Sequence, residues 1–140
     1  MKAQYTGHGN QPTQAREGDA GFDLAYFGQH PIDIKPNETA NIPTGIKVAL
    51  PYGVWGLITG RSSAFKRNLM TPLSVIDNGY RGDLFAIVRN IGHETITIQP
   101  DERIAQLIPI SMLADVIQWE WQNELDETER GENGFGSTGK

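Results

Sequence analysis

The chain has 140 residues, of which 38% are hydrophobic and 21% are charged, so we expect one compact domain with a real core. Its net charge of −5 argues against nucleic-acid binding, and the absence of cysteine excludes disulfides, thiolate nucleophiles and zinc–thiolate sites. Without an apolar run long enough to span a bilayer, or a signal-peptide core, the sequence predicts a soluble, cytoplasmic protein with no membrane partner.

Short apolar segments rich in β-branched residues recur between Gly, Pro and Asn. They cover residues 31–35, 45–50, 53–59, 83–90, 94–99, 103–110 and 115–121. Many alternate with period two, so that Ile96 and Ile98 share one face, and Trp119 and Trp121 share a face of another expected strand. This spacing of short strands predicts an all-β sandwich or barrel.

One helix is expected. Ser62 or Ser63 can cap it, and residues 63–69 continue it for about two turns before Pro72.

The composition changes at about Glu124, where an acidic run gives way to a glycine-rich end. That end has too little apolar surface to hold itself folded. We therefore predict a core domain over residues 1–124 and a flexible arm over residues 125–140.

Residues 134–140, GFGSTGK, have the G-x-x-x-x-G-K spacing of a P-loop. A P-loop also needs a hydroxyl and a helix after its lysine, and no residue follows Lys140 here. The spacing alone leaves two alternatives open, a tail without a role and a tail that binds phosphate by another route. Arg130 and Phe135 are unusual choices for a merely solvated tail.

The histidines His8, His30 and His93 are far apart and lack metal-ligand spacing, so we expect ordinary surface histidines. The sequence also lacks a G-x-S-x-G elbow, and with no cysteine it offers no nucleophilic triad.

Four stretches, residues 20–26, 60–67, 74–85 and 101–108, place polar or glycine residues where strands should end. In the second, Arg61, Ser62 and Ser63 combine a guanidinium and two hydroxyls with the N–H groups of a helix start, which suits a polyphosphate. A purely structural serine cap is the alternative.

In the third stretch, Asn78-Gly79 predicts the turn of a β-hairpin. Such a turn leaves Asp77 simply solvated, or it holds Asp77 beside Tyr80, as an acceptor for a water proton next to a flat ring for a sugar or base. Spacing does not decide between the two.

Together with residues 130–139, and in this order, the four stretches resemble the five motifs of the trimeric all-β dUTPases, the deoxyuridine triphosphate nucleotidohydrolases. The resemblance runs from about Ala20 to Gly139. It implies a distorted jelly-roll or β-barrel with one short helix, and a homotrimer whose sites combine motifs of different chains. It also implies Mg²⁺-assisted hydrolysis of dUTP to dUMP and pyrophosphate, which limits uracil in DNA and supplies dUMP for thymidylate synthesis.

The resemblance also implies roles for single residues. Asp77 would orient and deprotonate the attacking water, and Tyr80 would pack against the deoxyribose. Asp23 would reach Mg²⁺ through water. Main-chain groups of the third motif would read uracil. The implied phosphate contacts are Arg61, Ser62, Ser63 and Gln106.

In the tail, the resemblance implies that Phe135 stacks on uracil. Arg130, Gly136, Ser137 and Thr138 would close on the phosphates, with glycines letting the backbone approach. On this interpretation the tail is a phosphate-closing arm and its P-loop spacing is a coincidence.

Several positions depart from the family pattern: Gly60, Ser63 to Phe65, Thr71, Ser74 and Asn133. The departures at Thr71 and Ser74 bear on how the third motif recognises the base. Asn133 tolerates the positive φ of the glycine it replaces.

Two alternatives follow from the same residues. The homologous dCTP deaminases also have a motif like residues 60–63, but they need a glutamate where Ile87 stands and an arginine where Lys66 stands, so we expect the deaminating apparatus to be absent. The other alternative is a dUTP-controlled interaction protein. Pyrophosphate release from dUTP, without ammonia from dCTP, separates these hypotheses.

Overall fold

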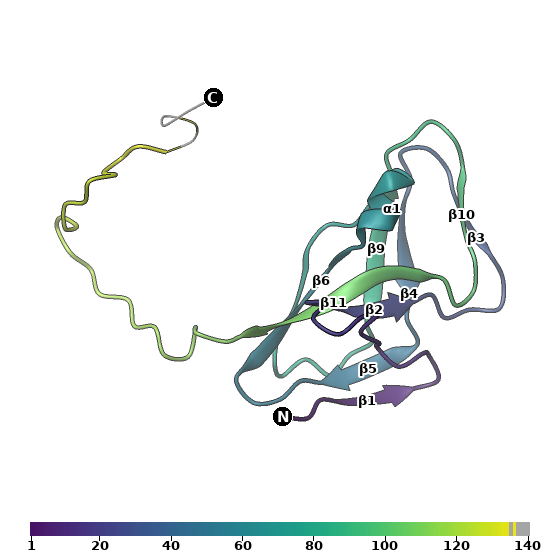
Figure 1. Ribbon diagram of the computed structural model, residues 1–140, viewed down its shortest axis with the longest axis horizontal. Helices are drawn as coiled ribbons and strands as arrows, with labels where there is room; N and C mark the ends of the chain where they lie inside the picture. The colour runs from purple at the N-terminus through teal and green to yellow at the C-terminus, as the bar shows by residue number, and fades with distance from the viewer. Residues whose placement is uncertain (135, 137–140) are drawn as a thin grey trace.

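The computed structural model describes residues 1–134 and 136, and the described chain is built mostly from short β-strands (Figure 1). The strands are β1 (Gln4–Gly7), β2 (Phe22–Ala25), β3 (Ile32–Ile34), β4 (Thr39–Pro43), β5 (Ile46–Ala49), β6 (Val54–Gly60), β7 (Leu69–Met70), β8 (Ser74–Ile76), β9 (Phe85–Asn90), β10 (Ile96–Ile98) and β11 (Arg103–Ser111). The helix α1 (Ser62–Lys66) follows β6. The predicted all-β class is confirmed.

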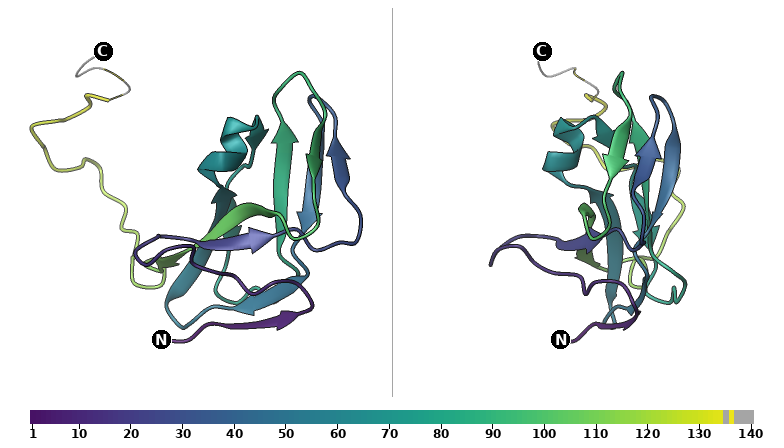
Figure 2. Two further views of the ribbon diagram at one scale, coloured as in Figure 1. Left: turned by 45° about the vertical axis from the view of Figure 1, so that its right-hand side comes forward. Right: turned by 90° about the vertical axis from the view of Figure 1, so that its right-hand side faces the viewer.

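The strands form four antiparallel sheets, ordered β2-β11-β6-β8, β4-β9-β7, β1-β5 and β10-β3. Figure 2 shows β3 and β10 at one side of the body and β1 with β5 at its base. Side chains from all four sheets are buried together in one core, among them Leu24, Ile42, Ile58, Val88 and Ile98.

Asn90, fully buried in β9, ties two of these sheets together. Its Nδ2 donates to Ile34 O and Glu94 O, and its Oδ1 accepts from Gly92 N. A buried amide is tolerated when all its polar atoms are bonded, so Asn90 fixes the β3–β10 pair against β9.

The sheet that contains β6 and β11 has two different faces. Along β6, Val54, Gly56 and Ile58 are buried, whereas the residues between them are half-buried. The strand register places Gln106 opposite Thr59, Ile108 opposite Leu57 and Ile110 opposite Trp55 on the outer face. That face is therefore polar near Gly60 and apolar toward Val54.

The turn at Asn78-Gly79 forms, but it does not close the predicted β-hairpin. Tyr80 N donates to Asp77 O, as a turn requires. However, β8 pairs with β6, and β9 pairs with β4 and β7. Asn78 Nδ2 donates to Pro51 O at 2.7 Å and Val54 O at 2.8 Å, so the turn is anchored to the β5–β6 loop and connects two sheets.

The helix is shorter than predicted and differs at its start. Arg61 is the N-cap residue, no side chain caps the helix, and Ser62 and Ser63 are its first two residues. The expected serine cap was therefore wrong. The helix ends at Lys66, and Asn68 then takes a positive φ of 64° just before β7.

The predicted strand over residues 115–121 was also wrong. The last strand ends at Ser111, and a turn in which Val116 N and Ile117 N donate to Leu113 O follows it. Trp119 and Trp121 are 95% and 80% exposed. In Figure 1 this part of the chain runs away from the strands, so the alternating pattern has no strand to pair with among residues 1–134.

The described residues include no helix with the length and apolar character needed to cross a membrane.

Candidate functional site

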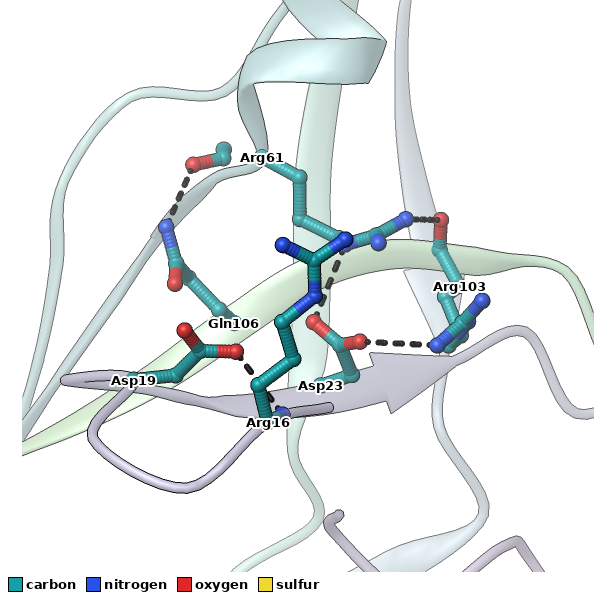
Figure 3. A network of polar contacts seen from close by, with 7 residues as sticks. Arg16, Asp19, Asp23, Arg61, Arg103 and Gln106 are labelled. Atoms are coloured by element: carbon teal, nitrogen blue, oxygen red, sulfur yellow. Dashed lines mark hydrogen bonds and ion pairs between the residues drawn. The ribbon is translucent and has the colours of Figure 1, made fainter. Parts of the chain in front are cut away.

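Asp23 lies at the centre of a cluster of charged side chains on the outer face of the β2-β11-β6-β8 sheet (Figure 3). Its Oδ1 accepts from Arg61 Nε at 2.9 Å and its Oδ2 accepts from Arg103 Nη1 at 3.2 Å. The Asp23 side chain is only 9% exposed. One nearly buried carboxylate therefore holds two guanidinium groups in place.

Arg61 is fixed at the start of α1 by a second contact, from its Nη1 to Arg103 O at 3.1 Å. Ser62 and Ser63 follow it and are exposed. The guanidinium, both hydroxyls and the start of the helix therefore gather at one end of β6, as the sequence predicted.

Gln106 lies across the strand pair from Asp23. Its Nε2 donates to Gly60 O at 3.0 Å, which fixes the orientation of the amide. Gly21 makes room for this side chain, because a Cβ atom there would lie 2.5 Å from Gln106 Oε1. Nearby, a Cβ on Gly60 would lie 3.3 Å from Thr71 Oγ1, a buried hydroxyl with no hydrogen-bond partner among the described residues.

Asp77 and Tyr80 lie together on the turn that Asn78 anchors. Tyr80 OH donates to Asp83 O at 2.9 Å, and the ring is 43% exposed. Asp77 is exposed. The turn thus carries an exposed carboxylate and a partly exposed aromatic ring three residues apart, joined by the backbone bond from Tyr80 N to Asp77 O.

The structure does not bring the two groups of predicted residues together within one chain. The β6–β8 register pairs Ile58 with Ser74 and Gly56 with Ile76, so β8 runs away from the Gly60 end of β6 toward Asp77. At about 3.3 Å per residue, the step from Gly60 to Gly56 separates the two ends by ~13 Å. Asp23, Arg61 and Gln106 therefore form one half of the candidate site, and Asp77 and Tyr80 form the other.

Of the predicted tail residues, the structure describes Arg130 and Gly136. Arg130 Nε donates to Asn133 O at 2.8 Å, and Gly136 has a positive φ of 89°. In Figure 1 the described chain beyond β11 runs away from the strands. Phe135, Ser137 and Thr138 lie outside the described residues.

Sequence reasoning missed Arg103 and Gly21 as parts of the site. Arg103 was visible in the fourth stretch, three residues before Gln106, but its pairing with Asp23 depends on the β2–β11 register. Gly21 belongs to the first stretch, and only the close approach of Gln106 explains why a glycine is needed there. The histidines are exposed as expected.

Comparison with known proteins shows which family the chain belongs to. The dUTPase family model matches residues 8–139. The chain belongs to the dUTPase family. It is 41% identical to the deoxyuridine 5'-triphosphate nucleotidohydrolase of Orientia tsutsugamushi (strain Boryong), over 97% of this chain and 93% of the relative. Identity to the protein of the same name from Bdellovibrio bacteriovorus is also 41%, over 95% and 90% of the two chains.

Solved dUTPase structures share this fold. The dUTPase of Staphylococcus bacteriophage 80alpha with dUPNHPP has a TM-score of 0.88 and 27% identity, with 99% of each chain covered. The EIAV dUTPase has a TM-score of 0.75 and 33% identity, with 89% of this chain and all of that chain covered. The predicted dUTPase-type jelly-roll is therefore confirmed.

The acidic groups of the site are suited to a magnesium ion held mostly by other ligands. Among the described residues, no three His, Asp or Glu side chains gather where they could bind a metal directly. Both oxygens of Asp23 already accept hydrogen bonds from guanidinium groups. Mg²⁺ keeps several waters and commonly binds substrate phosphates, so these residues fit an ion that Asp23 contacts through water.

Proposed function

We propose that this protein hydrolyses dUTP to dUMP and pyrophosphate, the activity by which its dUTPase relatives are named. The observation that carries the proposal is the Asp23–Arg61–Arg103 cluster beside Gln106 and the serines of α1. Planar guanidinium groups match the oxygens of phosphates, and Asp23 balances only one of the two positive charges. The cluster is therefore a cationic surface in a protein whose net charge is −5.

Asp77 is the proposed general base. A water molecule attacks the α-phosphorus, its proton passes to the Asp77 carboxylate, and the bond from the α-phosphorus to the bridging oxygen of the β-phosphate breaks. Pyrophosphate leaves with that oxygen. The anchored turn supports this role, because the carboxylate is open to solvent while its backbone is held by Asn78.

Mg²⁺ is the proposed cofactor, bound to the triphosphate, with Asp23 as its contact through water. When bound, it stabilises negative charge that develops on the phosphates. The protein groups of the same half-site, Arg61, Ser62, Ser63 and Gln106, bind and orient phosphate oxygens in this proposal.

The nucleoside is assigned to the other half-site and the tail. Tyr80 packs against the deoxyribose, main-chain groups of the Asp77–Tyr80 turn read uracil, and Phe135 stacks on the base. Arg130, Gly136, Ser137 and Thr138 then close over the phosphates. These roles for the tail stay predictions.

We propose a homotrimer, and the geometry of the proposed reaction supports contact between copies of the chain. The phosphate-binding residues and Asp77 must act on one substrate, yet they lie at opposite ends of β6 in one chain. Between them, the outer face carries Trp55, Leu57, Val75 and Ile108, all at least partly exposed. An apolar face that joins two half-sites fits contact with further copies of the chain, each supplying the half that its neighbour lacks.

A substrate panel tests the proposed function. dUTP, dCTP, dTTP and UTP are incubated with the full chain and Mg²⁺, and pyrophosphate and ammonia are measured. Pyrophosphate from dUTP alone is expected. Ammonia from dCTP would establish deaminase activity instead, and tight dUTP binding without turnover would favour the dUTP-controlled interaction protein.

Within a cell we propose a cytoplasmic enzyme that lowers dUTP and supplies dUMP.

A further inference from the structure

Arg16 lies on a loop beside the Asp23 cluster, and none of the roles described above includes it. The loop is tied to β2 by an isolated bridge between Thr13 and Asp23, in which each N–H donates to the other residue's carbonyl. Because Thr13 is fixed beside Asp23, a residue three positions further along is held within side-chain reach of the cluster.

Hydrogen bonds within the loop fix its shape. Arg16 N donates to Asp19 Oδ2 at 3.0 Å, and Asp19 N donates to Arg16 O at 3.1 Å. Gln14 Nε2 donates to Asp19 O at 2.8 Å. Asp19 therefore acts on the backbone of the loop and sets the point from which the Arg16 side chain leaves.

Figure 3 shows the Arg16 side chain extending from this loop toward Asp23 and Arg61. Within residues 1–134 and 136, its guanidinium makes no hydrogen bond or ion pair, whereas Arg61 and Arg103 share the Asp23 carboxylate. The cluster and the loop together bring the three positive charges of Arg16, Arg61 and Arg103 to the two negative charges of Asp19 and Asp23. Such a group of like charges is stabilised when a polyanion binds between them.

The proposed reaction indicates which part of the substrate binds at the Asp23 cluster and Arg16. The α-phosphorus must lie beside Asp77 to be attacked, and Asp77 belongs to the other half-site. The half-site with Asp23, Arg61 and Gln106 is then available to bind the phosphates that depart as pyrophosphate. We propose that Arg16 is a further substrate-binding residue, which contacts the phosphates beyond the α-phosphate from the loop over residues 13–23. This inference rests on the proposed function.

The test compares Arg16→Ala with Arg89→Ala. Arg89 is exposed on β9, and among the described residues its side chain bonds only to Thr39 Oγ1, so both variants lose one surface charge and have the same net charge. Affinity is measured by calorimetry with full-length protein, Mg²⁺ and either α,β-imido-dUTP or dUMP. We expect Arg16→Ala to bind the triphosphate analogue about tenfold more weakly than Arg89→Ala does, and dUMP within about twofold.

Equal affinities of the two variants for the analogue would overturn the proposal, and so would an equal loss for dUMP and the analogue. Arg16→Lys, which keeps the charge but not the planar fork, should recover part of the loss. Melting temperatures should not differ, because the Arg16 side chain has no partner in the described structure. Wild-type turnover of dUTP tests the proposed function separately, since these affinities need no turnover.

The role of the loop is tested by a double-mutant cycle with Asp19→Ala. If Asp19 positions Arg16, then Arg16→Ala should weaken analogue binding less in the Asp19→Ala background than in the wild type. Additive effects of the two substitutions would overturn this positioning role.

Discussion

At the scale of single residues, Asp23 explains how an acidic protein keeps a cationic site. Each of its oxygens accepts from a different arginine, so neither guanidinium is free to turn away from the sheet. The carboxylate balances one of the two charges, and the other remains available to an anion. Asp77 is arranged in the opposite way, since its backbone is fixed and its carboxylate is open to solvent.

The first prediction concerns Asp77→Asn. Asparagine keeps the shape of the side chain but cannot take up the proton, so turnover of dUTP should fall about 10²-fold or more while α,β-imido-dUTP still binds. Stopped-flow measurement of pyrophosphate release checks the rate, and calorimetry checks the affinity. Asp115→Asn, which removes an exposed carboxylate beyond β11, is the matched control. Near-normal turnover of Asp77→Asn would refute the assignment.

A second prediction concerns Gly21→Ala. The new Cβ would lie 2.5 Å from Gln106 Oε1, so the Gln106 amide must move away from its bond to Gly60 O. Because a flexible side chain can give way, the melting temperature should change little while KM for dUTP rises about tenfold. Combining it with Gln106→Ala should add almost nothing. Additive effects would show that Gly21 acts by another route.

At the scale of elements, the sequence predicted best those strands whose alternate residues are buried in the core of their own chain. Residues 53–59 and 103–110 became β6 and β11 because their alternate residues enter the core. Residues 115–121 carry the same alternation but form no strand, since none of the strands in the described part of the chain lies beside them. The hairpin prediction failed for a related reason. Asn78-Gly79 specified the turn, whereas partners distant in sequence specified which strands pair.

For the candidate site, too, the sequence predicted the local features and not the contacts that depend on strand pairing. Motif resemblance identified Asp23, Arg61 and Gln106, which the structure brings together, but it did not reveal that Asp23 pairs with Arg103. That contact depends on register, and the register shift between Arg103 and Ala105 is not written in any local pattern.

The third prediction belongs to the C-terminal segment. Removal of all residues after Glu129 should leave the melting temperature nearly unchanged, because the described part of this segment is mostly exposed and adds little to the core. Turnover of dUTP should fall about 10²-fold if Arg130 and the predicted donors of the tail act on the phosphates. Differential scanning fluorimetry and a pyrophosphate assay measure the two effects. A truncated protein with full activity would show that the tail has no catalytic role.

At the scale of the whole molecule, the main feature is that one chain holds two incomplete halves of a site. The β6–β8 register separates them, and the apolar outer face lies between them. Moving the halves together within one chain would require breaking strand pairs of the central sheet. In the proposed trimer, association of identical chains would complete the site without any such change.

The fourth prediction is that two inactive variants restore each other's activity. Arg61→Ala lacks the phosphate-binding half and Asp77→Asn lacks the base, so each should be inactive alone. In trimers formed at random from equal amounts of both, a site that takes Arg61 from one chain and Asp77 from another is complete in about a quarter of cases. Co-expressed or co-refolded mixtures should therefore regain roughly that fraction of wild-type turnover.

If both residues came from the same chain, no mixture would contain an intact site and activity would stay at the level of the separate variants. Light scattering on the same samples checks that trimers form, and wild-type protein mixed with Asp77→Asn serves as the control for subunit exchange.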